Sequence, residues 1–297
     1  MRTPLLYTIL SLALVACQQK VEHPGALDIQ GHRGTRGTMP ENTIPGFIQA
    51  LMDGATTLEM DVVMTGDGEI IVSHEPWFNP KICTDTAGQP FMERVSVLAV
   101  DMNYIRKCDC GSLSHPDFPE QHPYPASKPA LWEVLAVTEK MQTRDSVPAH
   151  YNIEIKYEDS PLFPERSLLV DRVLMEVQKA GIADRTTIQS FDPTVLELVH
   201  RADTAQKISL LLEEFTSVKE ALALLSFRPF AVSPEYNGVT AEKVAQLHDM
   251  NIMCLPWTVN DPGDMRRMMD MQVDGIITDF PGTLYSFVHP TTGGSTN

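Results

Sequence analysis

The sequence predicts an α/β fold, specifically a TIM (β/α)8 barrel, because short apolar segments alternate with amphipathic segments from residue 27 onward. Eight of the apolar segments have the length and the Val/Ile/Leu content of buried strands. Eight is the number of parallel strands that closes a TIM barrel, and a doubly wound open sheet is the alternative. The expected strands are residues 27–31, 57–64, 151–156, 186–190, 207–212, 230–234, 252–259 and 275–278.

Amphipathic segments between these strands have the spacing of helices that cover a sheet. The expected helices are residues 44–52, 131–141, 165–180, 193–201, 217–225, 241–250 and 262–271. Asn42 or Thr43 is a suitable N-cap for the first of them. A further apolar run, Ile70–Ser73, follows the second strand after a short turn that contains Gly66 and Gly68. The short connection requires it to run antiparallel, so it forms a β-hairpin outside the set of eight.

Residues 77–128 interrupt this alternation. The segment is rich in Pro and Cys and has only one plausible helix, at Val95–Arg106. A connection of this length in a compact domain is usually functional, so we expect a cap beside the active face; an extension without a catalytic part is the alternative. Four cysteines permit three pairings, and structural thiols or one disulfide are expected. They are Cys83, Cys108, Cys110 and Cys254.

The first residues resemble a bacterial lipoprotein signal. Residues 1–16 have a positive end and an apolar run too short to span a bilayer, and they stop at Leu14-Val15-Ala16-Cys17. Cys17 would then be lipidated, residues 17–26 would be a linker, and the barrel would occupy 27–288, followed by a disordered tail at 289–297. An ordinary secretory signal is the alternative. We expect a protein of the bacterial cell envelope, attached to the membrane only by its N-terminal lipid.

The charge balance excludes a basic nucleic-acid-binding surface. Lys and Arg number 23 against 39 Asp and Glu, which gives a net charge of −16. The sequence contains no cluster of basic residues of the kind that binds nucleic acid. We therefore expect no nucleic-acid partner. An acidic protein can still process an anionic substrate where a metal ion or local cations offset the repulsion.

Polar residues collect where the expected strands end, and TIM barrels place their sites at those ends. They are His32 and Arg33, Glu59 and Asp61, Asn152, Glu154 and Lys156, Ser190 and Phe191, Glu235, and residues 257–260. Charged side chains within apolar strands need partners or a metal. Three carboxylates on neighbouring strands suit Ca²⁺ or Mg²⁺ better than zinc. A solvated strand face and a plain Glu154–Lys156 ion pair are the simpler readings, but the apolar residues around Glu59 and Asp61 favour a strand covered on both faces.

The hairpin predicts the position of one histidine. If the turn centres on Gly66-Asp67, the residue numbers of two facing residues add up to about 133. This places His74 opposite Glu59 and on the face of the two carboxylates. His32 on the adjacent strand supplies a second imidazole. Two proton-transfer groups beside a metal that neutralises an anion are suited to phosphodiester cleavage.

Six motifs then carry a resemblance that covers nearly the whole mature chain. They are "GHRGTRGTMPENTIPGF", "GATTLEMDVVMTGDGEIIVSHE", "YNIEIK", "IQSF", "WTVN" and "VDGIITDFP". In this order they resemble the glycerophosphodiester phosphodiesterase family, a group of phospholipase C-like TIM barrels. The first two motifs together are highly specific, whereas "IQSF" or "WTVN" alone is weak. The resemblance implies hydrolysis of glycerophosphodiesters to sn-glycerol 3-phosphate and an alcohol.

The resemblance also implies roles for individual residues. His32 and His74 match the acid/base pair, and Arg33 and Lys156 match cations that hold the phosphate. Further matches are Glu59, Asp61 and Glu154 as ligands of a divalent metal, Ca²⁺ or Mg²⁺, and Trp257 as an aromatic residue of the pocket. Glu41 is expected to orient Arg33 or a metal-bound water. Glu75 departs from the Asp that is usual after the second histidine, although no assigned role depends on it.

Three functional hypotheses remain at this point. The first is the metal-dependent hydrolase, in which water or the substrate's own hydroxyl is the nucleophile. The second is a phosphodiesterase of the phosphatidylinositol phospholipase C type, which would share the histidine pair but act on lipid. The third is a lipid-anchored protein that binds glycerophosphodiesters without cleaving them, and it would have no use for two histidines beside a metal.

Overall fold

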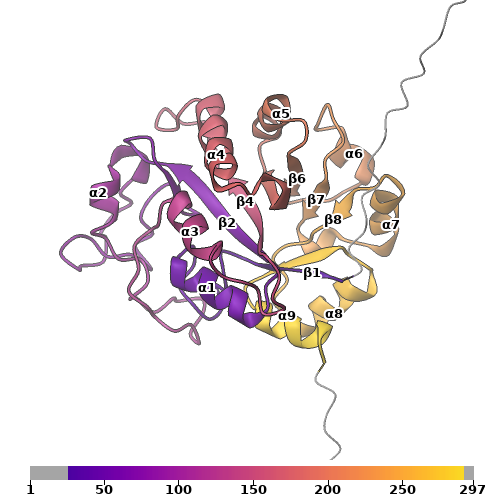
Figure 1. The fold of residues 1–297 in the computed structure, drawn as a ribbon, viewed down its shortest axis with the longest axis horizontal. Helices are drawn as coiled ribbons and strands as arrows, with labels where there is room; N and C mark the ends of the chain where they lie inside the picture. The colour runs from indigo at the N-terminus through magenta and orange to yellow at the C-terminus, as the bar shows by residue number, and fades with distance from the viewer. Residues whose placement is uncertain (1–25, 291–297) are drawn as a thin grey trace, which may run out of the picture.

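Eight parallel strands form a barrel in the computed structural model, which describes residues 26–290 (Figure 1). Along the sheet they are β8 (Met253–Cys254), β7 (Ala231–Pro234), β6 (Lys207–Leu212), β5 (Thr186–Ser190), β4 (His150–Ile155), β2 (Thr57–Met64), β1 (Asp28–Gly31) and β9 (Gly275–Thr278). Backbone hydrogen bonds close the circle, from Asp274 N to Cys254 O (3.1 Å) and from Val259 N to Ile277 O (2.9 Å). This closure confirms the predicted TIM barrel and excludes an open sheet.

The expected strand at 252–259 is much shorter than predicted. Only Met253 and Cys254 pair as a strand, and a single bridge joins Glu235 to Trp257 further on. Pro256 lies between them and has no N–H to donate to a ladder, so regular pairing stops before it. The chain still follows β7, since Trp257 N donates to Pro234 O at 3.0 Å.

Nine α-helices occur within residues 26–290, and the longer ones lie around the outside of the strands in Figure 1. They are α1 (Ile44–Asp53), α2 (Met102–Ile105), α3 (Leu131–Thr138), α4 (Arg166–Ala180), α5 (Pro193–Ala202), α6 (Val218–Leu222), α7 (Ala241–Asp249), α8 (Pro262–Asp270) and α9 (Pro281–Val288). Thr43 is the N-cap of α1 and accepts a hydrogen bond from Gly46 N. Helix α9 was not predicted; it begins directly at the end of the last motif, with Pro281 in its first turn.

Strand β3 (Ile70–Val72) pairs antiparallel with β2, as predicted, but in a different register. Val62 faces Val72 and Met64 faces Ile70, so the residue numbers of facing residues add up to 134 rather than 133. The reason is a three-residue loop, Gly66–Gly68, in which Gly68 has a left-handed backbone with φ of 88°. The prediction that His74 lies opposite Glu59 in the ladder is therefore wrong.

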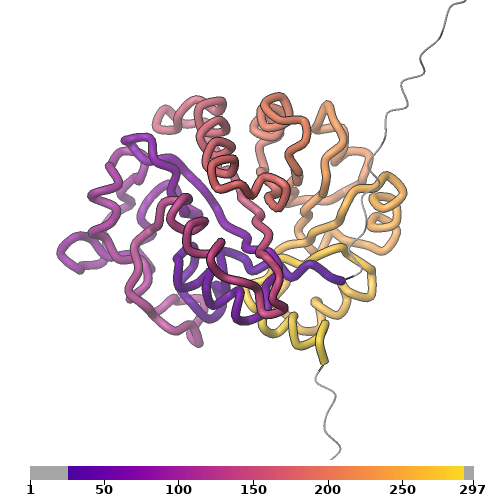
Figure 2. Tube along the Cα trace, viewed as in Figure 1, coloured from indigo at the N-terminus to yellow at the C-terminus, as the bar shows by residue number. Residues whose placement is uncertain are grey.

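The insertion at 77–128 forms a lobe beside the barrel, seen at the left of Figure 2. An apolar cluster joins it to β2 and β3 and includes Phe78, Val97 and Ile105 of the insertion with Val63 and Ile71 of the strands. The single helix expected at Val95–Arg106 is instead a 3₁₀ turn (Val97–Ala99) and α2, because Asp101 caps a new helix between them. Cys83 and Cys110 form a disulfide.

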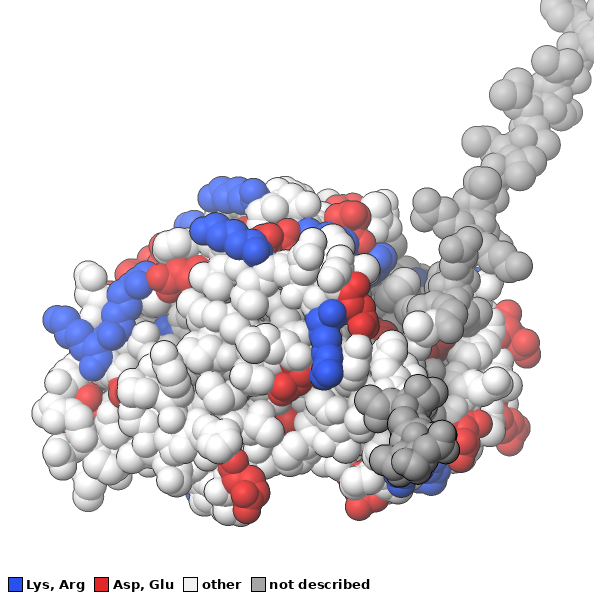
Figure 3. All heavy atoms as spheres, turned by 60° about the horizontal axis from the view of Figure 1, so that its bottom comes forward, with Lys and Arg blue, Asp and Glu red and all other residues white. Residues whose placement is uncertain are grey.

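Basic and acidic side chains are interspersed on the face shown in Figure 3. No helix within residues 26–290 is long and apolar enough to span a membrane. The predicted signal at 1–16, the lipidation of Cys17, nearly all of the linker and the tail from residue 291 lie outside the described residues.

Candidate active site

A cavity of about 260 Å³ opens at the C-terminal ends of the barrel strands. It collects polar side chains from β1, β2, β3 and β4 that are far apart in the sequence. The residues that line it include His32, Arg33, Glu59, His74, Glu154 and Lys156. Three larger hollows, one between α3 and α4, one at the opposite end of the barrel and one beside α1, contain none of these side chains. The predicted site residues therefore meet where TIM barrels carry out chemistry.

Three carboxylates form the acidic centre of this site. Glu59, Asp61 and Glu154 are all buried, and each offers a ligand oxygen within 4.8 Å of the others. Burial and the neighbouring carboxylates raise the pKa of Glu59 well above its ordinary range. Burial is also the main reason why the pKa of Glu154 rises to about 7. Both pKa values rise because burial and mutual repulsion destabilise the ionised carboxylates, and a bound cation would stabilise them.

Two hydrogen bonds fix the Glu59 carboxylate within this triad. Oε2 accepts from the backbone N–H of Arg33 at 2.8 Å, and Oε1 accepts from Gln189 Nε2 at 3.0 Å. Arg33 has a left-handed backbone with φ of 52°, a conformation that costs a non-glycine residue about 1–3 kcal/mol. Strained backbone of this kind often occurs at functional sites.

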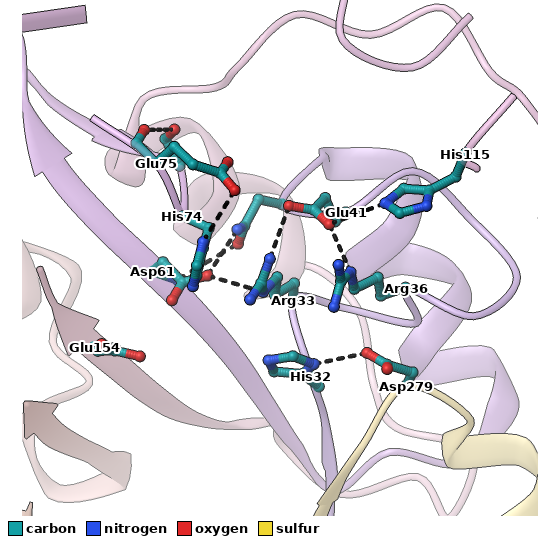
Figure 4. Close-up of polar contacts among 12 residues, drawn as sticks. His32, Arg33, Arg36, Glu41, Asp61, His74, Glu75, His115, Glu154 and Asp279 are labelled. Carbon is teal, nitrogen blue, oxygen red and sulfur yellow. Dashed lines mark hydrogen bonds and ion pairs between the residues drawn. The ribbon is translucent and has the colours of Figure 1, made fainter. Parts of the chain in front are cut away.

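Two cations already contact the triad (Figure 4 shows the Arg33 side). Lys156 Nζ lies 2.7 Å from Glu154 Oε1 and 3.1 Å from Asp61 Oδ1. Arg33 Nε lies 3.4 Å from Asp61 Oδ2. Burial lowers the pKa of Lys156, but the two carboxylates outweigh it and raise that pKa to about 12. When all three carboxylates are ionised, these two cations leave one net negative charge, so the oxygen ligands of the triad still favour a divalent ion.

His32 is held by a carboxylate that the sequence analysis did not identify. Its Nδ1 lies 2.6 Å from Asp279 Oδ1, and Asp279 Oδ2 accepts from Asn260 Nδ2 at 2.7 Å. Burial lowers the pKa of His32, and Asp279 opposes that shift. Asp279 directly follows β9 within the motif "VDGIITDFP", so the rule that strand ends carry site residues would have found it.

His74 reaches the cavity although β3 ends two residues earlier. Ser73 N still donates to Asp61 O at 2.9 Å, so the chain stays against β2 up to that point. His74 Nδ1 then lies 3.2 Å from Glu75 Oε1, and the imidazole lies beside Asp61 in Figure 4. His74 therefore lies beyond the end of the β2–β3 ladder but still lines the site.

Glu41 connects the first loop to the insertion. Its Oε1 accepts from Arg33 NH1 at 3.0 Å, its Oε2 accepts from Arg36 Nε at 2.6 Å, and His115 Nε2 lies 3.7 Å from Oε2 (Figure 4). The expected contact between Glu41 and Arg33 is therefore present. Asn42, considered only as a helix cap, donates instead to Asp61 Oδ2 at 2.8 Å. No sequence pattern indicated a role for His115, because it lies inside the insertion.

An aromatic wall faces the charged groups. Trp257 lines the cavity with Phe191, and the two rings meet edge to face with centroids 5.4 Å apart. Trp257 Nε1 donates to Ser233 O at 2.8 Å, which fixes the indole. Phe191 is 38% exposed, so the wall is also accessible from outside.

The profile of the glycerophosphoryl diester phosphodiesterase family matches residues 32–283. The chain belongs to this family. As a member, it is a phosphoric diester hydrolase.

Individual relatives agree with the family profile. The chain is 30% identical over 259 residues to a glycerophosphodiester phosphodiesterase of Bacillus subtilis, covering 84% of this chain and 82% of the relative. It is also 30% identical over 257 residues to one of Caldanaerobacter subterraneus, covering 86% and 96%. The crystal structure of a putative glycerophosphoryl diester phosphodiesterase from Silicibacter pomeroyi superimposes with a TM-score of 0.81 at 32% identity, covering 90% of this chain and 94% of that one.

Proposed function

We propose that this member of the family hydrolyses glycerophosphodiesters to sn-glycerol 3-phosphate and an alcohol. One observation carries the proposal: imidazoles from two different strand ends, His32 and His74, line one cavity. Two carboxylates of the acidic triad and the cations Arg33 and Lys156 line it as well. Relatives at 30% identity that bear the name glycerophosphodiester phosphodiesterase support the substrate class.

Arg33 and Lys156 would bind the phosphate oxygens. Arg33 is buried and Lys156 is half-buried. Both cations contact Asp61, and both line the cavity, where they can face a bound diester. Charge that develops on the phosphoryl oxygens is stabilised best by cations that are already in place, because no reorganisation is then needed. Trp257 and Phe191 would provide the apolar side of the pocket against the glycerol or the head group.

Glu59, Asp61 and Glu154 fit a hard divalent cation, Ca²⁺ or Mg²⁺, since all three offer only oxygen and their charge is incompletely neutralised. When bound, such an ion would polarise the phosphoryl group as a Lewis acid. The residues' own contribution is to hold it: Arg33 N–H, Gln189 and Asn42 fix the carboxylates of Glu59 and Asp61 in orientation.

The two histidines would divide the proton transfers. One removes the proton from the nucleophile, and the other protonates the leaving alkoxide. Asp279 accepts the Nδ1 proton of His32, which leaves Nε2 to exchange protons in the cavity. Burial keeps the pKa of His32 below its ordinary 6.5, so the ring is neutral near neutral pH.

One assay tests the proposal against its rivals. Purified protein is incubated with glycerophosphocholine or with phosphatidylinositol, in Ca²⁺, in Mg²⁺ and in chelator. Release of glycerol 3-phosphate is measured from the first substrate, and release of inositol phosphate from the second. We expect release only from glycerophosphocholine and only with metal. His32→Ala and His74→Ala should each abolish it, and His200→Ala on α5 should not. Cleavage of phosphatidylinositol would favour the lipase, and binding without release would favour the transport protein.

We further propose attachment of the chain to the bacterial cell envelope through a lipid on Cys17. The run of apolar residues that ends at Cys17 supports this, and the Cys83–Cys110 disulfide is typical of an oxidising compartment. Cells fed labelled palmitate should label the wild-type protein but not the Cys17→Ala variant. Equal labelling of both would refute lipidation at this residue.

A further inference from the structure

The insertion ends in a buried lysine directly behind the hairpin that delivers His74. Lys128 is only 7% exposed, and its Nζ donates to Ser73 Oγ at 2.7 Å. The backbone around it is fixed against β3, since Val72 N donates to Pro129 O at 2.8 Å and Ile71 bridges to Ala130. Lys128 is therefore held against the segment that leads into the catalytic histidine.

Ser73 passes this contact on to both sides of His74. Its hydroxyl accepts from Lys128 and donates to Glu75 O at 2.6 Å, while its N–H donates to Asp61 O at 2.9 Å. The Glu75 carboxylate lies 3.2 Å from His74 Nδ1 through Oε1. The stretch from Ser73 to Glu75 is thus fixed at three points, and the ammonium is bonded to its centre.

The charges around Lys128 also connect it to the His74 segment. Burial lowers the pKa of Lys128, and Glu75 is the carboxylate that opposes this most strongly, ahead of Glu41 and Asp61. The other oxygen of Glu75, Oε2, is buried and has no hydrogen-bond partner among the described residues. A lysine that is buried against an apolar cluster is costly to the fold unless nearby charge compensates it. Here the compensating charge belongs to the partner of His74.

We propose that Lys128 is a positioning residue for His74, and that it couples the insertion to catalysis. The ammonium holds Ser73 and the Glu75 carboxylate in place, and Glu75 in turn fixes the ring of His74 through Nδ1. The insertion lines none of the cavity, so it acts on the reaction only through residues placed behind the catalytic groups. This inference rests on the proposed role of His74.

The test compares Lys128→Met, which keeps the length of the side chain but removes the charge, with Lys128→Arg and Ser73→Ala. Arg106→Met is the matched control, because Arg106 is another cation of the insertion and bonds Glu133 of α3 at 2.7 Å. We expect Lys128→Met to lower kcat about 10- to 100-fold, the loss typical of a misplaced reacting group, with KM nearly unchanged. Lys128→Arg should recover part of kcat, Ser73→Ala should show a smaller loss, and Arg106→Met should match the wild type.

Melting curves and circular dichroism fix the folded fraction at the assay temperature. A wild-type kcat per folded Lys128→Met molecule would overturn the inference, and so would an equal loss in kcat for Arg106→Met. His74→Ala is measured in parallel to separate this inference from the proposed function. If His74→Ala is inactive and Lys128→Met is fully active, only the positioning role fails; if His74→Ala is active, the proposed acid/base pair itself fails.

Discussion

Replacement of Asp279 by Asn should reverse the hydrogen bond that sets the tautomer of His32. Asn260 Nδ2 donates to Asp279 Oδ2, so the carbonyl of the new amide must face Asn260. Asn260 cannot rotate to avoid this, because its Oδ1 accepts from Asp279 N at 2.9 Å. The new NH2 group therefore points at His32 Nδ1. The imidazole proton is forced onto Nε2, the nitrogen that must remain free to accept a proton in the cavity.

The structure sets the size of the effect. The bond from His32 to Asp279 measures 2.6 Å, and their side chains are only 12% and 2% exposed. A hydrogen bond to a charged group contributes about 1.5–3 kcal/mol, and about 1.4 kcal/mol is a factor of ten in rate, so its loss alone lowers kcat roughly 10- to 150-fold. The wrong tautomer increases the loss toward the roughly 10⁴-fold seen when the equivalent carboxylate of a serine protease is changed to an amide.

The assay is steady-state release of glycerol 3-phosphate, with kcat and KM determined separately. KM should change little, because Asp279 does not line the cavity. The limb of the pH–rate profile that belongs to His32 should move to lower pH, since Asp279 opposes the lowering of that pKa. Asp274→Asn is the matched control: Asp274 bonds His248 Nε2 at 2.9 Å at the other end of β9, and its loss should leave kcat unchanged. A folded Asp279→Asn variant within about threefold of wild-type kcat would refute the reasoning.

Three further predictions concern stability. Glu59→Gln should abolish activity but raise Tm in chelator, since the pKa of Glu59 is raised by burial and repulsion; an unchanged or lower Tm would contradict this. Burial raises the pKa of Glu139, but the bond from Arg185 outweighs it and leaves that pKa below the ordinary 4.5. This stabilisation is present above pH 4.5 and is lost as pH falls through the lower folded pKa, so the Tm deficit of Glu139→Gln should shrink from about pH 7 to about pH 3; a constant deficit would argue against it. The Cys83→Ser/Cys110→Ser double variant should lose about 3.5 kcal/mol in urea unfolding by the loop-entropy relation for a separation of 27 residues, and a loss below about 1 kcal/mol would exclude that account.

What could be predicted from the sequence depended on local spacing. The alternation of apolar segments predicted the barrel, and a spacing of two along a strand placed Glu59 and Asp61 together. The predicted hairpin register was wrong by one residue, because residue types do not determine whether a Gly-Asp-Gly turn has two or three loop residues. The observed loop depends on the left-handed backbone of Gly68.

The contacts that could not be predicted join distant parts of the chain. His32 and Asp279 are 247 residues apart, and Lys128 reaches Ser73 across 55 residues. No periodicity indicates that a lysine in an irregular segment will be buried behind a hairpin. Such pairings follow from the closed barrel and from the way the insertion packs on it, so they appear only when the fold is known.

Strand β3 pairs with one barrel strand, β2, and this affects how the enzyme could change. The carboxylates of the acidic centre sit on strands that are paired on both sides, so moving them would disturb the closed ladder. His74 directly follows the β3 segment, which is hydrogen-bonded to β2 on one edge and to residues 128–130 on the other. Substitutions at residues 128–130 can shift one catalytic group while the barrel stays intact. Directed evolution of turnover or head-group preference should therefore accumulate changes in the insertion before it alters the strands.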